Sequence, residues 1–278
     1  MAVKALRNIH PLDKHLRLSR IPTLYCPGCG IGIGLAAMLR ALDKRISEGS
    51  VNPDKVAWVG GIGCSARAVF YVNYDAAHVL HGRAIPFAEG LVLANPEILA
   101  IVVGGDGDIA GIGGNHLIHA ARRNIDMVVV MFTNFVYAMT GGQVAPTTPK
   151  GVKTTTTPHG NPEYPFNVVK LVASLNANYV ARASVTTPHY IEQFFYKALG
   201  LKGFRFIEVI STCPEVYGRH IGLRDPVEMY MELKKRVKYK SKPSIEESDI
   251  DWEKGIVIGE FLERNNPSYL DTIMGVAK

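Results

Sequence analysis

The sequence predicts a doubly wound α/β fold, with a mostly parallel sheet and helices on both of its faces. Three observations indicate it: short β-branched apolar runs, helical patterns between them, and glycine-rich turns after several of the runs. Apolar runs of this length are typical of parallel strands that are buried on both faces. Strands of this kind that alternate with helices form a layered α/β domain with right-handed crossovers.

The predicted strands are short, apolar and bounded by turn residues. They are residues 55–63, 98–107, 126–134, 178–185 and 204–212. Apolar residues recur at helical spacing in residues 33–46, 115–124, 165–177 and 188–199, which we expect to be helices. In such folds the functional side chains lie at the carboxyl ends of the strands.

The composition is that of a large folded domain. The 278 residues are 47% hydrophobic and 20% charged, with a formal net charge of +6. The basic residues are spread along the chain, apart from residues 232–242, which we interpret as a solvated helix face. We see no apolar run long enough to cross a bilayer and no leader sequence. We therefore expect a cytoplasmic protein with no nucleic-acid and no membrane partner.

Polar residues follow two of the predicted strands. A Gly-Asp-Gly sequence at residues 105–107 ends one strand, and Asn134 ends the next. The glycines allow a ligand to approach the backbone, and a helix predicted to begin near Gly113 offers amide donors to a phosphate. The Asp106 carboxylate, the Asn134 amide oxygen and the Val136 carbonyl would together form a hard-oxygen site for Mg²⁺ on a diphosphate.

All four cysteines of the chain fall in short glycine- or proline-containing segments. Cys26 and Cys29 lie in CPGCG, Cys64 in GIGCS and Cys213 in STCPE. The residues alone leave an iron–sulfur cluster, a Zn(Cys)₄ site, a redox-active pair and simple packing open. Zinc sites usually show two Cys-x-x-Cys pairs, which disfavours zinc here. A thioredoxin-like pair would leave Cys64 and Cys213 without a role.

The Gly-Asp-Gly sequence followed by Asn134 resembles the thiamine diphosphate-binding motif. The intervening IGGNHLIHAARRN resembles the β subunits of 2-oxoacid:ferredoxin oxidoreductases, in which similar cysteine segments bind a [4Fe–4S] cluster. The resemblance covers about residues 22–219 and implies thiamine diphosphate, Mg²⁺ and a [4Fe–4S] cluster as cofactors. It also favours the cluster over zinc at the cysteines.

The resemblance implies a role for each motif residue. The cluster ligands would be Cys26, Cys29, Cys64 and Cys213, and the magnesium ligands Asp106, Asn134 and Val136. Contacts to thiamine diphosphate would come from Ile62, Gly63, Cys64, Ser65, His81, Gly105, Gly107, Asp108, Ala138 and Met139. His81 and Arg83 would be catalytic, with His81 on the cofactor and Arg83 on a phosphate or carboxylate. A surface histidine and a salt-bridged arginine are the simpler alternatives.

The resemblance also implies the reaction and the partners. A 2-oxoacid would be oxidatively decarboxylated with coenzyme A, and the electrons would pass through the cluster to ferredoxin. The glutamate that engages the aminopyrimidine ring has no place in this chain, so we expect an α subunit in a heterodimer that dimerises further. The segment MTGGQVAPTTP resembles 2-oxoglutarate enzymes, with branched-chain 2-oxoacids and pyruvate as alternatives.

Two other kinds of protein remain alternatives. One is a non-catalytic electron-transfer or assembly subunit, against which the intact Asp106 and Asn134 argue. The other is a thiamine-dependent decarboxylase or carboligase, which would have no use for four cysteines. A dinucleotide site in GCGIGIG is excluded, because no apolar strand precedes it and the glycine spacing is wrong.

The predicted domain organisation has two parts. Residues 1–222 would form the thiamine diphosphate-binding domain with the cluster ligands. Residues 223–278 would form a helical extension packed on this domain or on a partner subunit. The histidines at positions 116 and 119 are interpreted as packing residues, because no third metal ligand is near them in sequence.

Overall fold

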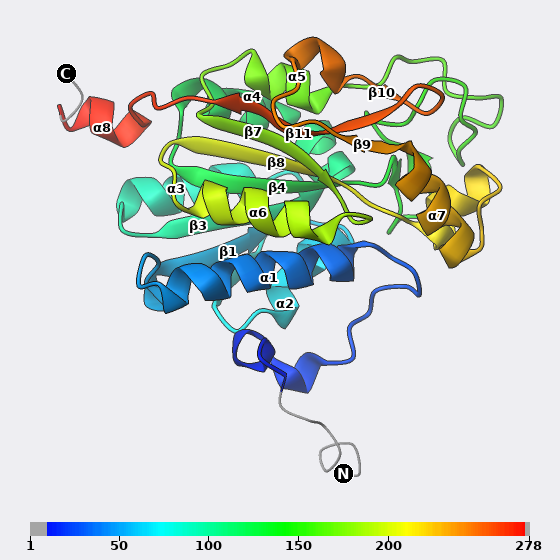
Figure 1. Ribbon diagram of the computed structural model, residues 1–278. Coiled ribbons are helices and arrows are strands. Elements are labelled where there is room, and N and C mark those ends of the chain that lie inside the picture. Colours follow the sequence, from blue (N-terminus) through cyan, green and yellow to red (C-terminus); the bar gives the residue numbers. More distant parts are fainter. Residues whose placement is uncertain (1–9, 276–278) are drawn as a thin grey trace.

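One mixed sheet organises residues 10–275, the part of the chain that the structure describes. The computed structural model places the strands in the order β10-β11-β7-β8-β4-β3-β1-β2, with β9 paired to β11 (Figure 1). The strands of this sheet are β1 (Val56–Gly60), β2 (Asp75–His78), β3 (Leu99–Gly105), β4 (Met127–Thr133), β7 (Tyr179–Ser184), β8 (Phe204–Ile210), β9 (Val237–Tyr239), β10 (Ile250–Asp251) and β11 (Gly255–Glu263). All pairs from β2 to β7 are parallel, as the sequence predicts.

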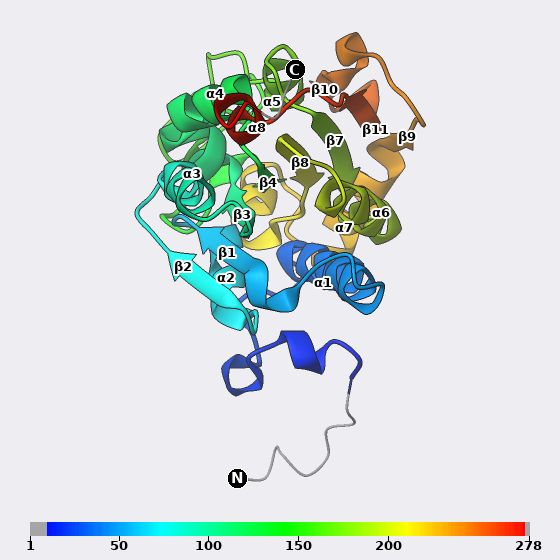
Figure 2. The ribbon, with the colours of Figure 1, turned by 90° about the vertical axis from the view of Figure 1, so that its left-hand side faces the viewer.

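Helices cover both faces of the sheet, which confirms the doubly wound arrangement (Figure 2). On one face lie α1 (Ile31–Ser47) and α6 (Pro188–Leu199), and on the other α3 (Ala84–Ala94), α4 (Gly114–Arg123) and α5 (Val168–Ala173). In β4, Val128 and Val130 contact the first core and Val129 the second. Both faces of β4 are therefore covered, which explains its uninterrupted apolar sequence.

The predicted strands and helices are all present, within a few residues of the expected bounds. Several elements were not predicted, among them the short edge strand β2, the strand pair β5 (Val136–Tyr137) and β6 (Gln143–Val144), and helix α3. Helix α3 contains Pro86 and Gly90 and is apolar on most of its surface. Neither a polar face nor a helical period therefore marked it in the sequence.

The prediction that residues 223–278 form a helical extension is wrong in part, because strands lie in this segment as well as helices. Its helix α7 (Pro226–Arg236) is present, but β9, β10 and β11 follow it before the short helix α8 (Tyr269–Ile273). Strand β11 joins the main sheet by antiparallel pairing with β7. The buried Ile256, Ile258 and Phe261 of β11 explain this placement, because they complete the two cores beside β7.

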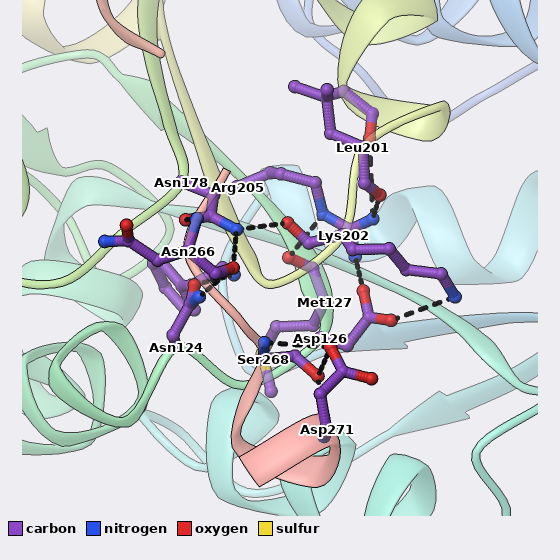
Figure 3. A network of polar contacts seen from close by, with 12 residues as sticks. Asn124, Asp126, Met127, Asn178, Leu201, Lys202, Arg205, Asn266, Ser268 and Asp271 are labelled. Atoms are coloured by element: carbon purple, nitrogen blue, oxygen red, sulfur yellow. Dashed lines mark hydrogen bonds and ion pairs between the residues drawn. The ribbon is translucent and has the colours of Figure 1, made fainter. Parts of the chain in front are cut away.

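A polar network ties the end of the chain to the amino ends of the parallel strands (Figure 3). The Asn178 side chain accepts a bond from the Asn266 amide at 3.1 Å and donates to the Asn266 carbonyl at 2.8 Å. The Asn124 side chain accepts from the Phe204 amide at 2.7 Å and donates to Pro267 at 3.0 Å. These two buried asparagines satisfy backbone groups that would otherwise be unpaired. The carboxyl ends of the same strands, at the other end of the sheet, are left open for ligands.

No helix between residues 10 and 275 is both long and apolar enough to span a membrane.

Candidate active site

A pocket opens where the carboxyl ends of β1, β3 and β4 meet, as the fold class predicts. Its cavity volume is about 80 Å³. The predicted cofactor and magnesium contacts all line it: Ile62, Gly63, Cys64, Ser65, His81, Gly105, Asp106, Gly107, Asp108, Asn134, Val136, Ala138 and Met139. The residues chosen from the sequence are therefore brought together around one space.

Asp106 lies at the bottom of this pocket and is almost completely buried. Its Oδ1 accepts a hydrogen bond from the Gly107 amide at 3.0 Å, and its Oδ2 accepts one from the Phe135 amide at 2.9 Å. The Thr147 hydroxyl also donates to Oδ2. Burial raises the pKa of Asp106 to about 6, although these three hydrogen bonds oppose the rise. A nearby cation would stabilise the charged form of such a carboxylate.

The chain makes a sharp turn after β4. Phe135 has a positive φ of 67°, which is uncommon for a non-glycine residue. The Asn134 side-chain oxygen accepts a bond from the Val136 amide at 3.3 Å. The turn therefore places the Asn134 side chain and the Val136 backbone beside Asp106 in the same pocket. A carboxylate, an amide oxygen and a carbonyl are ligands that Mg²⁺ accepts.

Asp108 holds His81 in place. The Asp108 Oδ1 accepts from the Gly82 amide at 2.6 Å and from the Ile62 amide at 3.3 Å, and it lies 2.8 Å from the His81 Nδ1. With Nδ1–H donated to the carboxylate, the His81 Nε2 is left for a ligand. The Asp108 Oδ2 is buried and has no hydrogen-bond partner among the described residues.

Arg83 does not line the pocket that contains His81. Gly82, which lies between them, has a φ of 71°, and the chain turns there. Arg83 lines a neighbouring groove together with Val79, Pro86 and other residues. Its Nη1 donates to the Gly82 carbonyl at 3.3 Å, a bond within its own turn. A catalytic role for Arg83 therefore stays a prediction.

The sequence analysis missed Tyr137, which lines the pocket between the predicted residues. Its hydroxyl donates to the Gly107 carbonyl at 3.2 Å. A Cβ atom at Gly107 would lie 2.3 Å from the Tyr137 ring, and one at Gly111 2.2 Å from its hydroxyl oxygen. These glycines lie in the π-helix Gly107–Ile112, which precedes α4, so the helical segment begins earlier than the predicted Gly113. Thr147 was also missed.

The four cysteines line a second cavity, of about 230 Å³. The loop that carries Cys26 and Cys29 is attached to the end of β8 by two hydrogen bonds. The Gly30 amide donates to the Thr212 carbonyl at 3.2 Å, and the Thr212 hydroxyl donates to the Gly28 carbonyl at 2.8 Å. These bonds hold the cysteine pair next to Cys213, although the two segments are far apart in the sequence.

Burial disfavours the thiolate form of Cys29, Cys64 and Cys213. Burial raises the pKa of Cys29 to about 12, and the neighbouring thiols contribute to the rise. Burial also raises the pKa of Cys64 and of Cys213. Within residues 10–275, no group of three or more His, Cys, Asp or Glu side chains converges on one point in a way that would hold a single metal ion. The cysteines surround a space instead of meeting at a point.

The two cavities share part of their lining. Cys64, Asn134, Ala138 and Met139 line both of them. Cys64 follows β1, and the other three residues follow β4. A group bound among the cysteines would therefore lie beside a ligand bound over Asp106. The histidines at positions 116 and 119 line neither cavity, and the second of them is exposed, which does not fit its predicted packing role.

Comparisons with known proteins place the chain in a family. Residues 61–209 match the model of the thiamine pyrophosphate enzyme, C-terminal TPP binding domain. The 2-oxoglutarate synthase subunit KorB of Methanothermobacter marburgensis is 43% identical over 267 residues, which cover 96% of this chain and 92% of that protein. The chain belongs to the β subunits of 2-oxoacid:ferredoxin oxidoreductases. This finding confirms the resemblance that its motifs indicated.

Other members of the family agree with this placement. The KorB subunit of Methanocaldococcus jannaschii is 41% identical over 95% of this chain and 96% of that protein. A solved structure of 2-oxoglutarate:ferredoxin oxidoreductase from Magnetococcus marinus matches with a TM-score of 0.82 and 29% identity. The match covers 98% of this chain and 91% of that one. That structure contains 2-oxoglutarate, coenzyme A and succinyl-CoA. The fold and the enzyme class of this oxidoreductase subunit are thus established.

Proposed function

We propose that this β subunit binds thiamine diphosphate, Mg²⁺ and a [4Fe–4S] cluster, and that with an α subunit it oxidises 2-oxoglutarate. In this reaction 2-oxoglutarate loses CO₂, and its acyl group becomes bound to the sulfur of coenzyme A. Two electrons pass singly to two ferredoxin molecules, and the thiol proton of coenzyme A is released. The shared lining of the two cavities, with Cys64 in both, carries the proposal.

The residues at the first cavity fit a diphosphate with its cation. Asp106 is buried, and no cationic side chain is hydrogen-bonded to it. Its Oδ1 accepts a single hydrogen bond and keeps a lone pair for Mg²⁺. With Asn134 and the Val136 carbonyl, it supplies the hard oxygens that this ion prefers. When bound, thiamine diphosphate supplies the electron sink for decarboxylation.

The residues at the second cavity fit an iron–sulfur cluster better than zinc. A single zinc ion needs all four sulfurs at about 2.3 Å from one point. Here the four thiols line one cavity, and within residues 10–275 no three such side chains converge to hold a metal ion. Burial favours the protonated form of Cys29, Cys64 and Cys213, so a cationic metal group would displace their protons on binding.

His81 is the proposed proton-handling residue. Its Nδ1 is held by the Asp108 carboxylate at 2.8 Å, and its ring contacts that of Tyr137 in an edge-to-face arrangement. The ring is partly exposed to the pocket, so Nε2 can hold or release a proton there.

The surroundings of the pocket favour a partner subunit. Among the described residues, no glutamate lines the pocket, so the aminopyrimidine-activating carboxylate has to come from another chain. Large apolar side chains are exposed around the same end of the sheet, among them Leu80 at 77%, Ile112 at 51% and Phe87 at 43%. Exposed apolar side chains that gather in this way mark a surface that another protein covers.

The names of the relatives support 2-oxoglutarate as the substrate. The test is an assay of the chain co-expressed with its α subunit, with coenzyme A and a viologen acceptor. We expect the highest kcat/KM for 2-oxoglutarate, lower values for pyruvate and 2-oxoisovalerate, and no reaction without coenzyme A. A preference for either of the other 2-oxoacids would contradict the proposed substrate.

A second assay tests whether Cys64, which lines both cavities, is needed for electron transfer. The Cys64→Ser variant is expected to bind thiamine diphosphate and to release CO₂ no more than about once per site, but not to reduce ferredoxin. Labelled CO₂ and reduced ferredoxin are measured in the same preparation. Wild-type rates of both would show that Cys64 has no part in electron transfer.

A further inference from the structure

Tyr25 and Arg67 are among the side chains without a thiol that also line the cysteine cavity. The Tyr25 hydroxyl oxygen is buried and has no hydrogen-bond partner within residues 10–275. Burial raises the pKa of Tyr25, and the neighbouring groups that add to this rise include Tyr71 and the thiols of Cys29 and Cys64. Tyr25 lines the same cavity as these thiols.

A buried hydroxyl without a partner is unusual. Leaving such a donor unsatisfied costs roughly 1–3 kcal/mol, so nearly all buried hydroxyls are paired in folded proteins. Tyr25 lines the cysteine cavity, where the other polar side chains are Arg67, Asn134 and Glu215 beside the four thiols. None of the described residues accepts a hydrogen bond from the Tyr25 hydroxyl, so a group bound in the cavity would supply the missing acceptor.

The ring of Tyr25 is fixed in position. It packs edge-on against the Tyr71 ring, with centroids 5.4 Å apart and planes at 69°. The Tyr71 hydroxyl in turn accepts a bond from the Leu24 amide at 2.9 Å. Tyr25 directly precedes Cys26, so the same loop carries the hydroxyl and two of the thiols. The direction of the hydroxyl is therefore set together with the thiols.

Arg67 brings a positive charge to the same cavity from a different element. It ends the short 3₁₀-helix Ser65–Arg67, which directly follows Cys64. Its guanidinium has no hydrogen bond or ion pair to any residue in the described range, unlike most arginines of this chain. Its charge opposes the rise that burial causes in the pKa of Cys64. An arginine without a carboxylate partner is available to a negatively charged occupant.

We propose that the Tyr25 hydroxyl donates a hydrogen bond to a sulfur of the group held in the cysteine cavity, and that Tyr25 and Arg67 together raise the reduction potential of that group. The inference rests on the proposed function, in which the group is a [4Fe–4S] cluster. One-electron reduction adds one negative charge to the cluster and moves no proton. A donor dipole and a cation stabilise the reduced form more than the oxidised form, which makes the potential less negative.

The test is a redox titration of the complex with its partner subunit, followed by the EPR signal of the reduced cluster. Loss of the signal in Cys213→Ser assigns it to this cavity. We expect Tyr25→Phe and Arg67→Gln to keep the wild-type content of iron and sulfide, and to shift the midpoint potential to more negative values. The double variant should have the most negative potential, and Arg67→Lys should lie closer to the wild type than Arg67→Gln.

Matched controls remove the same groups outside the cavity. Tyr196→Phe removes a surface hydroxyl that donates to Glu48 at 2.6 Å and does not line the cavity. Arg40→Gln removes a surface cation that pairs with Glu192 of α6. Both variants should keep the wild-type midpoint potential.

A further replacement at position 25 keeps the hydroxyl. It tests the hydrogen bond to the cluster even if Tyr25→Phe loses its cluster. Incorporation of 3-fluorotyrosine at position 25 makes the hydroxyl a stronger donor and should shift the potential in the positive direction. Unshifted potentials in Arg67→Gln and in the fluorotyrosine protein, with the cluster intact, would overturn the inference and leave the proposed function standing. A wild-type complex without iron and sulfide in this cavity would instead refute the proposed cluster, and the inference with it.

Discussion

The Asp106 carboxylate accepts a hydrogen bond from the Phe135 amide at 2.9 Å and so joins the ends of two neighbouring strands. Phe135 adopts a backbone conformation that costs a non-glycine residue about 1 kcal/mol or more. Its ring packs against Tyr217 and Trp252, which hold it from the core side. The turn that presents Asn134 is therefore held by packing on one side and by Asp106 on the other.

Replacement of Asp106 by alanine should remove both a proposed magnesium ligand and an anchor of this turn. We expect Asp106→Ala to weaken binding of thiamine diphosphate with Mg²⁺ by more than roughly 100-fold, because loss of outer-shell partners alone costs 10–100-fold. Thr147→Val, which removes one hydrogen bond to Asp106, should weaken it by roughly 10-fold. Calorimetric titration gives the affinities, and iron content serves as the control. Wild-type thiamine content in Asp106→Ala would contradict the magnesium assignment.

Asp108 and His81 should behave as a unit in catalysis. Asp108→Asn removes the charge that orients the His81 ring and should lower kcat by roughly 100-fold, the contribution of a positioned acid–base group. His81→Gln should have an effect of similar size. Because the two residues act through one contact, the kcat of the double variant should be little lower than that of either single variant. Steady-state assays of the three variants give the result. Losses that multiply would show that the two residues act independently.

The close contact between Gly107 and Tyr137 predicts a stability effect. A methyl group at position 107 would meet the Tyr137 ring at 2.3 Å, so Gly107→Ala should cost about 1–3 kcal/mol. Gly114→Ala is the matched control in the following helix, because nothing lies within 4 Å of the added carbon. It should leave the free energy of unfolding unchanged or slightly higher. Urea denaturation of the two variants measures both effects, and equal stabilities would contradict the contact.

The ion pairs of Asp43 with Lys14 and His15 predict a dependence of stability on pH. Burial tends to raise the pKa of Asp43, but the hydrogen bonds from these two residues outweigh it, and the pKa falls below its ordinary value of 3.8. The carboxylate therefore stabilises the fold above this value, and the contribution is lost as the pH falls through the lower folded pKa.

The Asp43→Asn variant tests this dependence. Near pH 7 it should be about 1 kcal/mol less stable than the wild type, the upper range for partly exposed ion pairs. The difference should shrink as the pH falls below about 4. Asp54→Asn removes a surface carboxylate that forms no ion pair within residues 10–275, and it should show no such trend. The measurement is the free energy of unfolding of the wild type and of Asp43→Asn at several pH values. A difference between the two proteins that does not change with pH would contradict the ion-pair explanation.

Much of the site was predictable because its residues lie next to strand ends. The apolar run of β4 marks a strand, so Asn134 at its end had to face the same edge as Asp106. Thr147 was not predictable in this way. It lies 41 positions from Asp106, in a long loop, and no local pattern brings a threonine hydroxyl to a carboxylate.

Arg83 shows a second limit of sequence reasoning. It is adjacent to Gly82 and two positions from His81, so the His-Gly-Arg sequence suggested a common direction. The left-handed backbone at Gly82 separates the two side chains instead, with His81 in the pocket and Arg83 at the start of α3. A backbone angle of this kind depends on the contacts of the folded state, here the Gly82 amide on Asp108.

The pairing of β11 with β7 has a consequence for work with shortened forms of this protein. A chain that ended before residue 255 would leave one edge of β7 with unpaired amides and carbonyls. It would also remove the Val257 carbonyl, which accepts a bond from the fully buried Arg182 at 3.3 Å. An exposed, apolar edge strand is a template for pairing with other chains. Fragments limited to the cofactor-binding residues should therefore aggregate, even though every residue proposed to touch a cofactor would still be present in them.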